Sequence, residues 1–230
     1  MTASDNLSEL DQIRASLAAE QARIAIGMEA RKAARIDERI AGCTPYQAAV
    51  VAALAARRTA AIGDLPKAEA DYDEFRKLFQ AAERMNQAHL RSAPTKTVTT
   101  EVSARLEEIL GSEDFPTENP GGSEGYFRSA AISIACLRDA WTLQDLKHTR
   151  SALSSAYKFA NKLDRHLPTP PAEPLAEAET ACQSADLDAV AALGEPISVE
   201  QFDELAATPP SLALGQAYRA RVAEIIAAGQ

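Results

Sequence analysis

The stretch from residue 125 to 168 constrains the fold most, because its apolar residues recur at the spacing of an α-helix. They are Phe127, Ala130, Ile134, Leu137 and Trp141, followed by Leu146, Leu153, Ala156, Ala160, Leu163 and Leu167. The spacing changes phase between Trp141 and Leu146, so one straight helix would turn part of this stripe away from a core. We therefore expect two helices, or one sharply bent helix, with Thr142 capping the second part.

The composition favours an all-α fold. The 230-residue chain is rich in alanine and contains only 10 glycines and 5% aromatic residues, and its segments show helical rather than strand-like periodicity. The polar, acidic N-terminus lacks the apolar region of a signal peptide, and the apolar run at 46–56 is too short to span a bilayer. We expect a soluble, cytoplasmic protein without a membrane partner, whose Cys43, Cys136 and Cys182 are buried thiols.

Charge and proline suggest two parts. The chain has a net charge of −9, and residues 168–230 hold ten carboxylates against two arginines, a balance of −8. The segment 168–174 contains four prolines and predicts a stiff connector. We therefore expect a main helical bundle at 1–167 and a small acidic helical module at 175–230. This module would dock on a basic surface, either of a partner or of this chain, unless its carboxylates serve only to keep the surface soluble.

The N-terminal region predicts a long helix over residues 4–41, ended by Gly42. Leu10, Leu17 and Ile24 lie seven residues apart, the spacing of a coiled-coil seam, and favour self-association or binding to another protein. Arg31, Arg35 and Arg39 form a basic cluster on the same helix. Because acidic residues interrupt the cluster and no aromatic residue accompanies it, nucleic acid is not the expected partner.

The other predicted helices follow local start and stop signals. Thr44, Pro45 and Gln47 form a capping box before a buried helix to about residue 62, and Asp64 is expected to cap a helix reaching about residue 91. A short helix is expected at 101–110 and a long loop at 111–125. Four short helices are expected beyond the connector, at about 175–183, 186–193, 199–207 and 212–228, with Ser198 opening the third.

A metal site is the first chemical hypothesis. Asp145 and His148 lie three residues apart and share a helix face, and Asp164 and His166 follow near the end of the same helix. A di-iron bundle needs two Glu-x-x-His pairs and two further glutamates, and this chain has one Asp-x-x-His. We therefore favour a capping role for Asp145 and a surface position for His148, and expect no metal or other cofactor.

No sequence motif of a nucleophilic, phosphate-binding or dinucleotide-binding site is present. The sequence thus favours a non-catalytic helical interaction protein, such as an adaptor, scaffold or assembly subunit, and argues against an enzyme. The alternative is an enzyme or small-molecule sensor whose pocket lies inside the bundle under the 111–125 loop.

Overall fold

The computed structural model describes residues 34–65, 72–111, 124–165 and 174–228, together with eight positions nearer the N-terminus: Arg14, Ala18, Gln21, Ala22, Ala25, Glu29, Arg31 and Lys32. All regular elements in these residues are helical, which confirms the all-α expectation. They are α2 (Ile36–Ala41), α3 (Pro45–Ala60), the 3-10 helix η1 (Ala61–Asp64), α4 (Asp73–Leu90), α5 (Lys96–Leu110), α6 (Glu124–Leu143), α7 (Leu146–Arg165), α8 (Leu175–Leu193), α9 (Val199–Ala206) and α10 (Pro209–Ala227).

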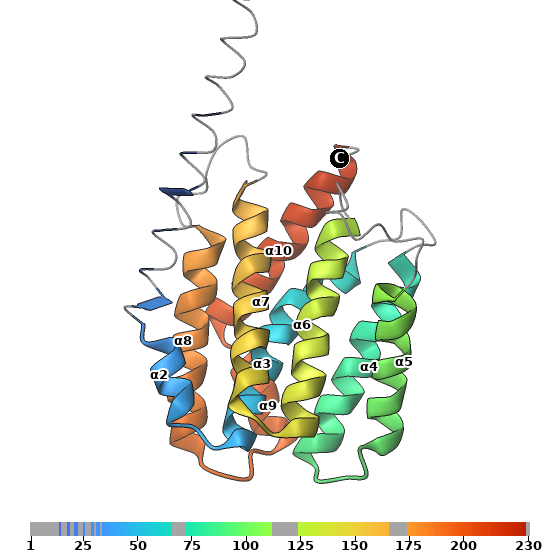
Figure 1. Cartoon of the computed structure of the whole chain (residues 1–230), viewed down its shortest axis with the longest axis vertical. Helices are drawn as coiled ribbons and strands as arrows, with labels where there is room; N and C mark the ends of the chain where they lie inside the picture. Colours follow the sequence, from blue (N-terminus) through green and yellow to red (C-terminus); the bar gives the residue numbers. More distant parts are fainter. Residues whose placement is uncertain are drawn as a thin grey trace, which may run out of the picture.

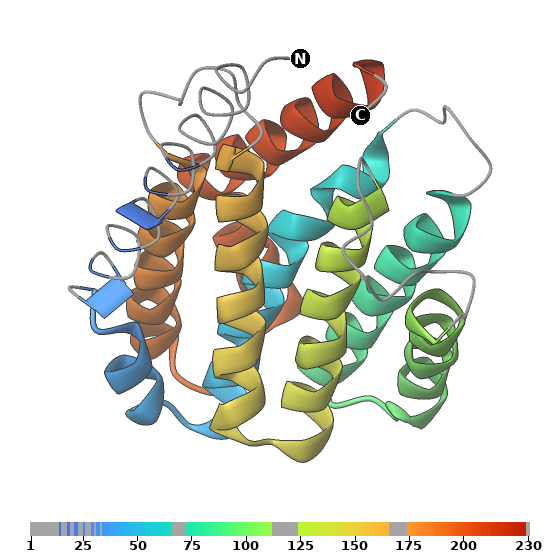
Figure 2. The same ribbon diagram turned by 45° about the horizontal axis from the view of Figure 1, so that its top comes forward.

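Helix α3 lies at the centre of the bundle. Helices α6 and α7 stand side by side in front of it, with α8 and α2 beyond α7 and with α4 and α5 on the other side of α6 (Figure 1). Helix α10 crosses obliquely behind and contacts α3, η1 and α8 (Figure 2). Residues 48–56 of α3 are buried on every side, because alanine lets the surrounding helices approach closely.

The helices on both sides of the predicted connector share one apolar core. Leu137 and Leu153 from the central pair belong to the same buried cluster as Leu187, Val190 and Tyr218 from α8 and α10. The C-terminal helices therefore pack against the bundle and are not held away from it. Whether residues 175–230 also fold by themselves stays a prediction.

Several helix ends agree with the sequence signals. Thr44 and Ser198 each accept a hydrogen bond in a complete capping box, and Gly42 follows the last residue of α2. The change of phase after Trp141 separates α6 from α7, as expected. The cap is different, however: Thr142 bonds back to the Arg138 carbonyl of α6, while Asp145 accepts a hydrogen bond from the backbone of His148.

Several predicted boundaries were wrong, and the helix expected at 101–110 already begins at Lys96 as α5. Arg35 has a left-handed backbone (φ 51°), which breaks the expected 4–41 helix before α2. Asp64 ends η1 and does not cap α4, which begins at Asp73. The two helices expected at 175–183 and 186–193 are one helix, α8, because the polar residues between them include neither glycine nor proline.

Some predictions concern residues that lie outside the described part of the chain. They include Leu10, Leu17 and Ile24, most of the 111–125 loop, and His166. Among the described helices, none is both long and apolar enough to cross a membrane.

Candidate functional site

Helix α7 concentrates basic charge in a chain whose net charge is negative. It carries Lys147, Arg150, Lys158, Lys162 and Arg165, and its single carboxylate is Asp164. The spacing of Lys147, Lys158 and Arg165 puts them on one side of the helix, and all three are exposed. Lys162 lies beside them, half-buried. We call Lys147, Lys158, Lys162 and Arg165 the basic face of α7.

Two lysines of the basic face are exposed and are not held in ion pairs within the described residues. Within the described residues, Lys147 and Lys158 have no ion-pair partner. Lys162 holds its ammonium 4.9 Å from the centre of the Tyr126 ring, and burial together with Arg165 lowers its pKa. The positive potential along this side of α7 is thus available to an acidic partner.

Asp164 is turned away from the basic face and performs a structural task. Its two carboxylate oxygens accept hydrogen bonds from the backbone N–H groups of Leu175 and Ala176, at 2.9 and 3.0 Å. These are unpaired donors of the first turn of α8, whose own cap residue, Pro174, makes no side-chain hydrogen bond. The metal hypothesis for Asp164 is therefore replaced by a capping role.

Asp145 and His148 lie together at the start of α7. Asp145 accepts a hydrogen bond from the His148 backbone at 2.9 Å, and its Oδ1 lies 2.7 Å from the His148 ring. These hydrogen bonds lower the pKa of Asp145. No group of three or more metal-ligating side chains occurs anywhere in the described part of the chain.

The predicted basic cluster lies against α8. Arg31 donates to Gln183 at 2.9 Å and lies over the Tyr157 ring, while Arg39 pairs with Asp188 at 2.6 Å. Arg35, in contrast, pairs with Glu38 of its own helix. Two of the three arginines thus already meet the acidic segment of the same chain, as one version of the docking hypothesis predicts.

Arg58 forms a buried ionic cluster that the sequence did not predict. Its guanidinium donates to Glu179 at 2.9 and 3.1 Å and to Asp186 at 2.7 Å, and all three side chains are almost completely buried. Tyr218 also donates to Glu179. Burial disfavours the charge, but the two carboxylates outweigh it and raise the pKa of Arg58 well above its ordinary value.

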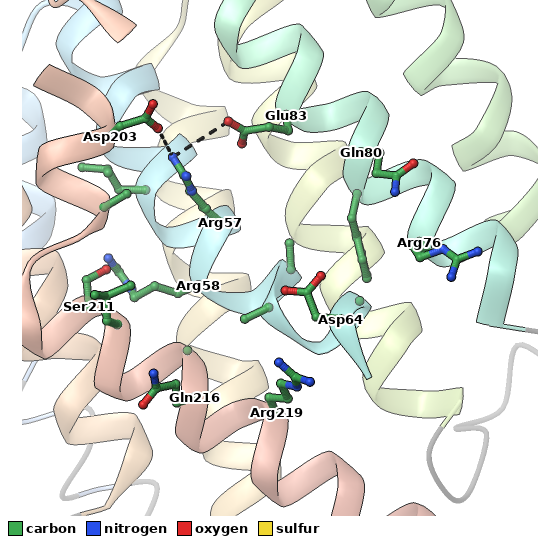
Figure 3. Close-up of a pocket in the computed structure, with 18 of the residues that line it drawn as sticks. Arg57, Arg58, Asp64, Arg76, Gln80, Glu83, Asp203, Ser211, Gln216 and Arg219 are labelled. Atoms are coloured by element: carbon green, nitrogen blue, oxygen red, sulfur yellow. Dashed lines mark hydrogen bonds and ion pairs between the residues drawn. The ribbon is translucent and has the colours of Figure 1, made fainter. Parts of the chain in front are cut away.

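An open cleft of about 690 Å³ lies between α3, η1, α4, α9 and α10. Its polar lining includes Arg57, Asp64, Arg76, Gln80, Glu83, Asp203, Ser211, Gln216 and Arg219, which Figure 3 shows as sticks. Buried Leu54 and Phe79 form part of its apolar lining. This volume falls within the range of ligand pockets.

The two ends of the cleft differ in how their charges are satisfied. At one end, Arg57 Nη1 lies 2.6 Å from Asp203 and 3.8 Å from Glu83 (Figure 3). At the other, Asp64 of η1 and Arg219 of α10 face the same space, and within the described residues neither has an ion-pair or hydrogen-bond partner. One end of the cleft therefore holds a guanidinium that is shared by two carboxylates. The other end holds two charges of opposite sign, and neither is paired within the described residues.

Comparisons with family models, curated proteins and solved structures produced no match for this chain. The function must therefore be inferred from the basic face of α7 and from the cleft. Sequence reasoning missed both. Helical periodicity would have placed the lysines of α7 on one face, but the cleft combines residues from five separate elements.

Proposed function

We propose that this chain is a non-catalytic helical interaction protein, an adaptor, scaffold or assembly subunit, whose basic face of α7 binds an acidic segment of another protein. The observation that carries the proposal is the exposed charge of Lys147 and Lys158, neither of which forms an ion pair within the described residues, in a chain of net charge −9. Opposite charge on a partner would steer association and select the partner, because complementary potentials act over about 8 Å at physiological salt.

The surroundings of the basic face favour a protein partner. Between Lys147 and Lys158, the same side of α7 carries Ser151 and Ser154, which are partly exposed and can donate hydrogen bonds to carboxylates. The neighbouring helix α6 exposes Ile132, with 45% of its surface accessible. A bound segment would pair with the lysines at a polar rim, and exposed apolar side chains such as Ile132 would supply contacts of the kind found in the core of an interface.

A titration with defined probes tests this proposal. A fluorescent poly-glutamate peptide should bind the intact chain at low salt and should bind more weakly as salt is added. The double variant Lys147→Gln/Lys158→Gln should lose about tenfold or more in affinity, since it removes two exposed charges from the same side of α7. The matched control Arg91→Gln/Lys96→Gln removes the same charge from exposed positions elsewhere and should bind normally.

Two results would overturn the proposal. Equal losses in the two double variants would mean that the peptide responds to net charge and not to the basic face. Tighter binding of duplex DNA than of the acidic peptide would show that the partner class is wrong.

The small-molecule alternative was expected to use a pocket under the 111–125 loop. Residues 112–123 lie outside the described part of the chain, and the cleft beside η1 is lined by other elements. A ligand for that cleft is therefore a separate question.

A further inference from the structure

We propose that the cleft between α3, η1, α4, α9 and α10 binds a small zwitterion, namely a free amino acid with a cationic side chain. This inference does not depend on the partner proposed for α7. It rests on which charges in the cleft are already paired and which are not.

The unpaired charges match the head group of an amino acid. Such a group carries a carboxylate and an ammonium separated by one carbon atom, so its binding site needs a cationic and an anionic group facing the same space. Arg219 and Asp64 meet this need, since they come from different helices, both are exposed, and no ion pair joins them. A guanidinium binds a carboxylate through two parallel hydrogen bonds, which would orient the ligand at Arg219.

The opposite end of the cleft favours a cation. Arg57 is shared between Asp203 and Glu83, so three charged groups leave one negative charge in excess. A ligand ammonium or guanidinium would balance this excess. Leu54 and Phe79 lie in the lining and offer apolar contact to the methylene groups of the ligand.

The rest of the cleft supports a polar, water-accessible site. Arg58 also borders the cleft, but its guanidinium is held by Glu179 and Asp186 and is not free to take the ligand carboxylate. Arg76 is held by Asp73. Arg219 is therefore the lining arginine that no carboxylate of the described chain neutralises.

Thermal unfolding of the intact chain with L-lysine at millimolar concentration tests the proposal, since a ligand that binds only the folded state raises Tm. The expected result is an increase in Tm with L-lysine, a smaller one with L-norleucine, and none with Nα-acetyl-lysine or lysinamide. No increase with L-lysine, or an equal increase with the acetylated and amidated forms, would overturn the head-group assignment. Equal increases in Tm with L-norleucine and L-lysine would overturn the proposal that the Arg57 end binds the cationic side chain of the ligand.

Two single variants locate the site. Arg219→Gln should weaken L-lysine binding in calorimetry by about tenfold or more, because it removes a charged hydrogen-bond donor. Arg221→Gln is the matched control, since Arg221 is on the same helix, pairs with Glu224 and does not line the cleft. Circular dichroism should show both variants folded. Binding unchanged in Arg219→Gln would place the ligand elsewhere and overturn the proposal.

Discussion

At the scale of single residues, Arg58 joins α3 to two buried carboxylates of the C-terminal segment. The change Arg58→Ala leaves Glu179 and Asp186 buried without a counter-ion. Removing one partner of a buried ion pair costs about 3–5 kcal/mol, because the remaining charge stays unsolvated. We expect a fall of this size in the free energy of unfolding, measured by urea denaturation.

The neighbouring residue provides the control for this experiment. Arg57 also pairs with a carboxylate of the C-terminal segment, Asp203, but its side chain is 39% exposed. Since an exposed ion pair contributes about 0–1 kcal/mol, Arg57→Ala should change stability little. If both variants lose similar amounts of stability, the effect of Arg58→Ala does not come from the burial of its ion pairs.

His89 is expected to make stability depend on pH. Its ring stacks on Trp141 at 4.6 Å, its Nε2 is buried and has no hydrogen-bond partner among the described residues, and burial lowers its pKa from 6.5. Below pH 6.5 the unfolded chain therefore takes up this proton before the folded chain does, so the free energy of unfolding falls as the pH is lowered.

The variant His89→Phe separates this contribution from that of other groups. It keeps an aromatic ring beside Trp141 but has no proton to gain. Urea denaturation at a series of pH values between 7.5 and 5.5 should show a smaller loss of stability in the variant than in the unchanged chain. Parallel pH profiles would mean that another group causes the dependence.

At the scale of elements, the helix termini show how neighbouring segments are connected. Helix α8 begins at Leu175 with no cap of its own, and Asp164 of α7 supplies the missing acceptors. Helix α2 is short, but its Ile36 and Ile40 are buried in the core. The residues that make these contacts stabilise the bundle, so a deletion that tests another role should leave them in the chain.

The predicted self-association through Leu10, Leu17 and Ile24 can be tested by a truncation that respects these contacts. Deleting residues 1–28 removes the seam but keeps Arg31, Ile36 and Ile40 in place. If the seam joins two copies, light scattering should show a larger mass for the full chain than for the truncated chain, since a/d positions bury apolar surface only in an assembly. If light scattering shows that both chains are monomers at high concentration, the prediction is wrong.

At the scale of the whole molecule, the acidic segment is joined to the bundle by both charge and apolar contact. Arg39 and Asp188 form an exposed link, whereas Val190 and Tyr218 belong to the shared core. Exposed ion pairs weaken with salt, but buried pairs and apolar contacts are screened much less. The response to salt therefore reveals which kind of contact holds the segment.

A protease site placed within residues 168–173 allows this test on a folded chain. After cleavage, we expect the two fragments to elute together in size-exclusion chromatography at both low and high salt, and Arg39→Gln should not change this. Separation of the fragments at high salt would instead support docking driven mainly by exposed charge, as the sequence alone suggested.

The sequence by itself determined the helical class and several helix ends, because the signals that start and stop a helix act within a few residues. The capping boxes of Thr44 and Ser198, the stop at Gly42 and the change of phase after Trp141 are all of this kind. Only the tertiary structure decided the pairing of charges. Arg58 meets Glu179 and Asp186 across 121 and 128 residues, and Arg219 reaches the same cleft as Asp64 only because α10 crosses α3 and η1. Such pairs depend on how helices assemble, and local periodicity carries no information about that.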